Sequence, residues 1–174
     1  MENYMSEKKV ITGKVRFNYV NLIYPKKIGE SRDAKYSVCL LIEKGDHDTL
    51  NKIYRAIEVA TMEAKDRWGE DIVKDIKSPI YDGDTLPDLK WEFIGKYFIN
   101  ASSKIKPGIV DKNLKAITDT SEVYSGCYGR ASISFYPYRI EDKVGIAIGL
   151  NNVQVLEDGE YLGNRPTAED DFAV

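Results

Sequence analysis

The sequence predicts a mainly β domain of the α+β class: five short antiparallel strands, one long helix and an acidic C-terminal tail. Several short runs alternate apolar and polar residues, which is the pattern of half-buried strands. One longer segment has its apolar residues at helical spacing. The 174 residues suffice for one domain with its own core. We expect that domain over 10–156, between a frayed N-terminus at 1–9 and the tail at 157–174.

The first expected strand begins at Val10 and has one apolar and one basic face. A loop punctuated by proline and glycine separates it from a second run, 35–43, which returns antiparallel to it. We expect the apolar parity to face the core and the other parity to face solvent. The residues expected inside are Val15, Phe17 and Tyr19, and those expected outside are Lys14, Arg16 and Asn18.

The expected helix covers 46–68, where apolar residues recur every three or four positions. Asp46 or Asp48 can cap its N-terminus, and Gly69 ends it. A helix between strand-like runs is typical of an α+β fold.

The chain after the helix returns to β structure. Residues 71–79 suggest a short helix or an ordered loop, and 81–88 form an acidic surface loop rich in turn residues. A strand at 91–102 follows, and a basic turn leads from it to the last expected hairpin.

That hairpin, at 124–156, consists of two β-type runs joined by a turn at 141–143. In its second run bulky residues alternate with Gly145, Ala147 and Gly149, so one face is nearly bare. We expect a flat or extended ligand to lie close to the backbone there. The residues expected to be buried in the first run are Ala131, Ile133 and Phe135. The bulky side of the second run carries Val144, Ile146, Ile148 and Leu150.

Five or more short strands with one long helix are typical of the oligonucleotide/oligosaccharide-binding barrel, the OB-fold. No apolar run approaches the ~20 residues of a membrane span, and the N-terminus lacks the apolar core of a signal peptide, so a cytoplasmic protein is expected. The two cysteines, Cys39 and Cys127, read as buried hydrophobes. With His47 as the one histidine, no metal or cofactor is expected.

The net charge of −3 at first argues against a nucleic-acid partner. However, 157–174 contain six acids and one base, which leaves 1–156 with 24 bases and 22 acids. A slightly basic body with an acidic tail is compatible with a groove that binds a phosphate backbone.

Single-strand binding without sequence preference requires rings on which bases stack and cations that follow the phosphates. The chain has 12 Tyr, 5 Phe and 2 Trp, and most of these rings belong in the core. Several of the others are interleaved with Lys or Arg, and an ordinary solvated sheet face is the open alternative for them. The candidate nucleic-acid-binding residues are Lys14, Arg16, Tyr24, Lys26, Lys27, Tyr36, Lys104, Lys106, Tyr128, Arg130, Tyr136 and Tyr138.

Four segments together resemble a family of bacteriophage single-stranded DNA-binding proteins, long catalogued as a domain of unknown function. The resemblance covers about 10–172 and implies an OB-fold that coats single strands during phage replication or recombination. The segments are Lys96-Tyr-Phe-Ile-Asn-Ala-Ser-Ser-Lys, Lys106-Pro-Gly-Ile-Val-Asp, Tyr124-Ser-Gly-Cys-Tyr-Gly-Arg-Ala-Ser-Ile and Val144-Gly-Ile-Ala-Ile-Gly-Leu-Asn-Asn-Val-Gln-Val-Leu.

The tail carries Glu169, Asp170, Asp171 and Phe172, a group of acids followed by a ring. This end resembles the partner-recruiting tip of single-stranded DNA-binding proteins, although two residues follow the ring here. An acidic segment can also occupy a basic groove when DNA is absent. A disordered solubilising end is the alternative, and homo-oligomerisation stays open.

Two other functions remain open at this stage. A phage structural or adaptor protein would share the β-rich pattern. A metal-dependent nuclease would use the carboxylates of Asp82, Asp84 and Asp88 to hold magnesium, but these lie in a turn-rich loop without a nuclease motif. We therefore expect a DNA-binding protein that is not an enzyme.

Overall fold

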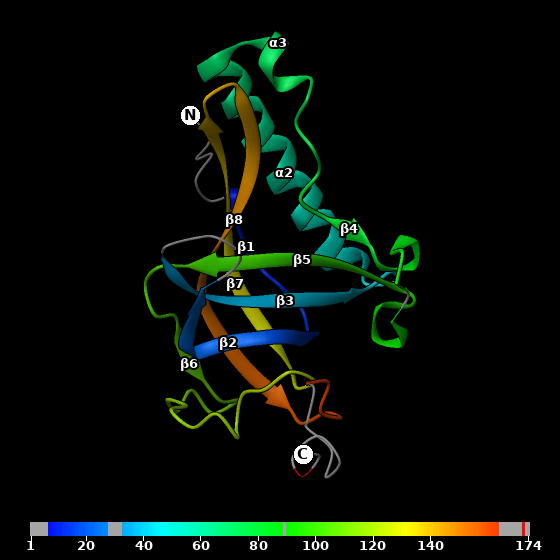
Figure 1. Ribbon diagram of the computed structural model, residues 1–174, viewed down its shortest axis with the longest axis vertical. Coiled ribbons are helices and arrows are strands. Elements are labelled where there is room, and N and C mark those ends of the chain that lie inside the picture. The colour runs from blue at the N-terminus through cyan, green and yellow to red at the C-terminus, as the bar shows by residue number, and fades with distance from the viewer. Residues whose placement is uncertain (1–6, 28–32, 89, 164–171, 173–174) are drawn as a thin grey trace.

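The computed structural model describes residues 7–27, 33–88, 90–163 and 172. In this part of the chain, eight strands form one sheet, and a long helix lies at one end of it (Figure 1). The helices are α2 (His47–Trp68) and α3 (Glu70–Val73), and the 3-10 turns are η1 (Gly83–Thr85) and η2 (Trp91–Phe93). The strands are β1 (Lys9–Ile11), β2 (Val15–Lys27), β3 (Ala34–Glu43), β4 (Tyr81–Asp82), β5 (Lys96–Ser103), β6 (Gly108–Val110), β7 (Tyr128–Ile140) and β8 (Lys143–Glu157).

Five of the strands form a closed ring of pairings. β2 pairs with β3, β3 with β5, β5 with β8, β8 with β7, and β7 returns to β2. The three short strands add to this ring, with β1 beside β7, β4 beside β5 and β6 beside β8. The prediction of a mainly β chain with one long helix is confirmed.

The predicted antiparallel arrangement is wrong at two places, because β8 runs parallel to both β5 and β6. The sequence pattern does not reveal strand direction here, since the alternation of inward and outward residues is the same in both senses. The long connection through β7 is what allows β8 to return in the direction of β5.

The core fills the ring and is closed by α2. Phe17, Ile133 and Phe135 are fully buried inside the ring, and α2 packs its own buried residues against β7 and β1. The predicted N-cap is confirmed, because the Asp46 carboxylate accepts a hydrogen bond of 3.2 Å from the Thr49 amide. No helix of the described residues is long and apolar enough to span a membrane.

The alternation predicted for β2 is wrong at Tyr19, which lies with its ring outside the core. The register with β3 shifts between Asn18 and Asn21, and Tyr19 has a φ of +46°. Such a shift adds residues on one strand and reverses the order of faces beyond it. Arg16 and Asn18 are also buried, against the prediction, because other parts of the chain cover the outer face of β2.

The β7–β8 hairpin has the predicted buried residues in β7. In β8 the bulky side is buried from Ile146 onward, with Val144 only half-buried. The bare face of β8 is nevertheless occupied by the hairpin's own rings. Tyr138 pairs with Gly145 across the two strands, and the Tyr136 ring lies 3.3 Å from where a Cβ of Gly149 would stand. A ligand therefore meets these rings before it meets the backbone.

Candidate nucleic-acid interface

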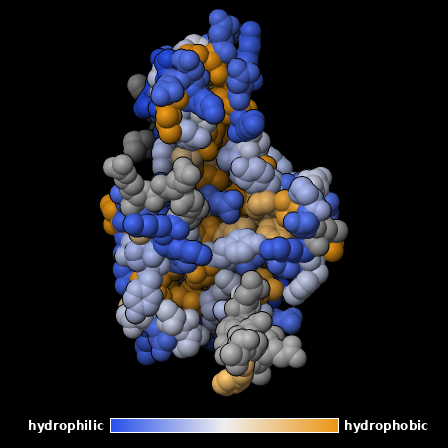
Figure 2. Space-filling model, viewed as in Figure 1, coloured by the Kyte–Doolittle hydropathy of each residue, from blue (hydrophilic) through white to orange (hydrophobic). Residues whose placement is uncertain are grey.

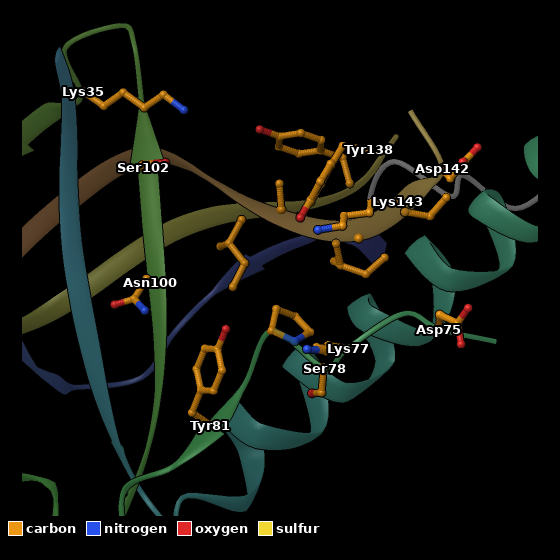
Figure 3. Close-up of a pocket in the computed structure, with 17 residues that line it drawn as sticks. Lys35, Asp75, Lys77, Ser78, Tyr81, Asn100, Ser102, Tyr138, Asp142 and Lys143 are labelled. Carbon is orange, nitrogen blue, oxygen red and sulfur yellow. The ribbon is translucent and has the colours of Figure 1, made fainter. Parts of the chain in front are cut away.

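A groove of about 740 Å³ opens between β5, the β7–β8 hairpin and the segment that leads from α3 to β4 (Figure 3). Tyr136 and Tyr138 line it from β7, and they are 46% and 41% exposed. Asn100 and Ser102 line it from β5, on the face of the strand that is turned away from the core. The groove thus brings together rings and hydrogen-bonding groups at a place that is open to a ligand.

The charges around the groove give it a small positive excess. Its described lining contains Lys35, Lys77 and Lys143 against Asp75 and Asp142. Figure 3 shows Lys143 beside Tyr138, while Lys77 lies across the cavity from them. Figure 2 shows apolar residues in the middle of this side of the molecule and hydrophilic residues around them. An apolar floor with cations at the rim suits a ligand with flat faces and negative charge.

A row of four aromatic rings runs from the groove across the outer face of the sheet. Tyr81 lines the groove and stacks on Phe98 with 5.2 Å between the ring centroids. The two rings meet because β4 pairs with β5 at these two residues. Phe98 meets Phe93 edge to face at 5.0 Å, and Phe93 lies 6.3 Å from Tyr19. The row therefore links β4, β5, η2 and β2, with Phe93 buried and Tyr81 and Tyr19 exposed at its two ends.

Arg16 of β2 is not part of this row, and its guanidinium forms hydrogen bonds with the protein's own backbone. Its Nε donates to the Gly126 carbonyl at 3.1 Å and its Nη2 donates to the Glu160 carbonyl at 2.8 Å. The group also lies 5.3 Å from the ring centroid of Tyr128 and 5.6 Å from that of Trp91. With 9% of its surface exposed, Arg16 is placed to fix structure.

Lys14 is committed in a similar way, although it is exposed. Its Nζ lies 2.7 Å from the Glu157 carboxylate and 5.6 Å from the Tyr128 centroid. The hydrogen bond to Glu157 raises the pKa of the Lys14 ammonium. Lys14, Arg16 and Tyr128 thus lie together, at the opposite end of β7 from Tyr136 and Tyr138.

Residues 157–163, the first part of the expected tail, lie against the ring of strands. The Leu162 amide donates to the Ser125 carbonyl at 2.9 Å, and the Tyr124 hydroxyl donates to Asp158 at 2.9 Å. A side chain at Gly126, whose φ is +116°, would overlap the carbonyl oxygen of Glu160. This strap, as we call 157–163, covers Arg16 from outside. Glu169, Asp170 and Asp171 lie outside the described residues, and Phe172 is exposed.

The remaining candidates are spread over the surface. Tyr24 lies at the edge of a smaller pocket of about 330 Å³, together with Tyr124 and Tyr161. Lys26 and Lys27 are exposed at the end of β2, while Tyr36 is half-buried on β3.

The other three basic candidates do not line the groove either, and so none of the seven predicted basic residues does. Lys104 and Lys106 are exposed in the turn between β5 and β6, where Lys104 pairs with Asp33 at 3.3 Å. Arg130 is exposed, and its Nε donates to the Thr12 carbonyl at 3.0 Å.

Several groove residues were missed by the sequence reasoning. Lys77, Tyr81, Asn100, Ser102 and Lys143 do not belong to a basic or aromatic cluster in the sequence. Asn100 and Ser102 share a parity within the strand expected at 91–102, opposite to Ile99 and Ala101, and this alternation was the one available signal.

The Lys44 ammonium lies between two carboxylates, one at the end of β4 and one in the acidic loop that follows it. Lys44 Nζ lies 2.7 Å from Asp82 and 2.6 Å from Asp84, and these hydrogen bonds hold the pKa of both carboxyls below the usual range. Among the described residues there is no cluster of three or more metal-ligating side chains. Lys44 therefore offsets part of the negative charge of these two carboxylates.

Comparison with known proteins gives one consistent family. The family model described as the ssDNA-binding protein of Enterobacter phage Enc34 matches residues 8–174. Protein p50 of Acyrthosiphon pisum secondary endosymbiont phage 1 is 27% identical over 176 residues, which cover 94% of this chain and 92% of p50.

Solved structures agree on the fold. The single-stranded DNA-binding protein of bacteriophage Enc34 in complex with ssDNA superposes with a TM-score of 0.78 at 22% identity, over 94% of this chain and 96% of that one. The gp2.5 single-stranded DNA-binding protein of bacteriophage T7 gives a TM-score of 0.64 at 16% identity, over 95% and 98% of the chains. The resemblance predicted from the sequence is confirmed: the chain belongs to the family of the phage Enc34 single-stranded DNA-binding protein.

Proposed function

We propose that this protein binds single-stranded DNA without sequence preference and coats it during phage DNA replication or recombination. The observation that carries the proposal is the placement of Tyr136 and Tyr138 as half-exposed rings in a groove rimmed by lysines. Stacking is tolerant of sequence because every base has a π-face, and the lysines attract phosphates wherever they lie along the strand. Membership of the family and the names of its members support the same conclusion.

The groove residues have distinct roles in this proposal. Tyr136 and Tyr138 stack on bases, while Lys35, Lys77 and Lys143 draw the backbone to the groove. Asn100 and Ser102 offer hydrogen bonds to base edges or sugars from the floor. Because the charged contacts are few, the logarithm of the binding constant falls only moderately with the logarithm of the salt concentration. The slope is roughly −0.7 for each phosphate contacted on a single strand.

The proposal also assigns a fold to the ring of strands and a role to each part of the chain. The closed ring of β2, β3, β5, β8 and β7 is an OB-fold barrel, and 10–156 form the domain that binds DNA. The tail at 157–174, with its acids and Phe172, recruits a replication or recombination protein or competes with DNA for the groove. The chain acts by binding and is not an enzyme.

Fluorescence anisotropy with a labelled oligothymidine tests the proposal directly. Binding to the single strand at low salt, weaker binding to a duplex of equal length, and loss of binding as salt rises are the expected results. An absence of binding at low salt, or a clear preference for duplex, contradicts the proposal. Adding magnesium to the same mixture should leave the oligonucleotide intact, whereas cleavage would favour a nuclease.

The magnesium-dependent nuclease is disfavoured by Lys44, which already occupies the space between Asp82 and Asp84.

A further inference from the structure

Two large rings outside the groove remain exposed on the loop-covered part of the sheet. Trp91 in η2 is 59% exposed, and Tyr19 in β2 is 51% exposed. They belong to one local cluster, since Phe93 of η2 contacts Tyr19 and Lys90 precedes Trp91 in the chain. A group of exposed rings, unlike a single one, is typical of a binding surface.

The backbone at Tyr19 holds its ring outward at a cost. Its φ of +46° is a conformation that bulky residues rarely adopt, and it comes where the alternation of β2 would bury the ring. Asn18 stabilises this turn by accepting a hydrogen bond of 2.8 Å from the Tyr19 amide. Strained positions of this kind are often found at functional sites.

A cation lies beside each ring. Lys90 Nζ lies 5.6 Å from the Tyr19 centroid and donates to its hydroxyl at 3.1 Å, and this bond raises the pKa of the ammonium. The Arg16 guanidinium lies 5.6 Å from the Trp91 centroid, and the backbone carbonyls that it binds fix its position. Each ring thus has one side occupied by a positive charge and a large part of its surface open.

The cluster and the groove are connected through packed rings beneath the surface. From the exposed Tyr19 the contacts run through Phe93, which is buried, and Phe98, which is half-buried, at steps of 5.0 to 6.3 Å. They end at the exposed Tyr81, which lines the groove that holds Tyr136 and Tyr138. We infer that Tyr19 and Trp91 form a second base-stacking platform, on which the DNA strand in the groove continues across the outer face of β5 and η2. This inference rests on the proposed function and gives the strand its path.

Tryptophan fluorescence tests the platform while Trp91 and Tyr19 themselves stay unaltered. Trp68 and Trp91 are the two tryptophans of the chain, so the Trp68→Phe variant reports on Trp91 alone. Titration with oligothymidine should quench this emission, and an abasic oligonucleotide of equal length and charge should quench it far less. Equal quenching by both strands, or none by either, would overturn the inference.

Affinity measurements with Trp91→Ala and Tyr19→Ala test the same point by binding. Each should weaken binding of a long oligothymidine about ten-fold, as expected for the loss of one stacked base, and leave the salt slope unchanged. Trp91→Phe, which keeps a ring, should restore most of the affinity. Tyr54→Ala, which removes an exposed ring of α2 outside the groove lining, is the matched control.

The length dependence separates this inference from the proposed function. For the wild type, affinity should keep rising with oligonucleotide length until both platforms are filled, whereas for the two alanine variants it should stop at a shorter length. If Trp91→Ala fails to fold, Tyr19→Ala and the fluorescence titration decide. Failure of the wild type to bind any single strand refutes the proposed function. Normal binding and length dependence in both alanine variants, with Tyr136→Ala impaired, refutes only the second platform.

Discussion

The guanidinium of Arg16 and the carbonyl oxygen of Glu160 are joined by a hydrogen bond of 2.8 Å. A second bond joins the same side chain to the Gly126 carbonyl at 3.1 Å. One buried cation near the start of β2 therefore holds the strap that follows β8. This link between the two ends of the domain has consequences for stability that differ from those of the exposed basic residues.

Arg16→Met should destabilise the fold by about 2 kcal/mol, because two carbonyls lose a charged hydrogen-bond donor in a buried place. Urea unfolding followed by circular dichroism measures this difference. Lys14→Met is the matched control, since Lys14 forms an exposed ion pair with Glu157 and should change stability little. Equal stability of Arg16→Met and the wild type would show that the strap does not depend on Arg16.

Gly126→Ala should be still more disruptive. The residue has a φ of +116°, and a Cβ there would overlap the Glu160 carbonyl oxygen. We expect a loss of about 3 kcal/mol or more, from strain and from displacement of the strap. The thermal unfolding midpoint is the measurement. Gly45→Ala, where a Cβ meets no atom within 4 Å, should unfold close to the wild-type temperature, and a similar loss in both variants would refute the steric explanation.

Tyr136→Ala and Tyr138→Ala should each weaken binding of single-stranded DNA about ten-fold, which corresponds to about 1.4 kcal/mol for one stacked base. Both rings are half-exposed, so the unfolding midpoint should move little. Anisotropy titration at fixed salt gives the affinity, and Tyr136→Phe should bind as the wild type does.

Arg130→Ala provides a comparison on the same strand. Its guanidinium donates to the Thr12 carbonyl and does not line the groove, so its effect on affinity should be smaller than that of either tyrosine. A larger effect would place the DNA on the β1 side of β7 and contradict the assignment of the groove.

The acid stability of the protein should depend on Lys44. Its hydrogen bonds lower the pKa of Asp82 and Asp84 from the ordinary value of 3.8. A carboxyl with a lowered pKa in the folded state contributes stability above its unfolded pKa, and that contribution is lost as the pH falls through the folded value. Lys44→Met should therefore be less stable than the wild type at neutral pH.

The comparison of the two proteins across pH is the decisive measurement. The difference in free energy of unfolding between them should be constant above pH ~5 and shrink below pH ~4, as both carboxyls take up protons. A difference that does not change with pH would mean that Lys44 stabilises the protein through its contact with the Tyr97 ring, 5.0 Å away.

Local pattern was sufficient to predict the long helix, its Asp46 cap and the buried residues of β7. These features depend on spacing over a few residues, which the sequence states directly. The groove could be predicted only in part: Tyr136 and Tyr138 followed from parity, but Asn100, Lys77 and Tyr81 come from three separate segments that tertiary structure brings together.

The errors on β2 have a common physical origin. Parity says which side of a strand a residue occupies, but it does not reveal a register shift such as the one at Tyr19, nor a strap that covers the outer face at Arg16. The direction of β8 relative to β5 was unpredictable for a similar reason, because strand pairing depends on contacts between distant segments.

The parallel pairing of β8 with β5 also determines when the domain can be completed during synthesis. β8 supplies the partner of both β5 and β7 and ends at Glu157. Until it has left the ribosome, the nascent chain has two unpaired strand edges, which are sites of aggregation. Closure is thus a late event that requires distant contacts, and such contacts slow folding. The ring of strands can therefore close only after Glu157 has been synthesised.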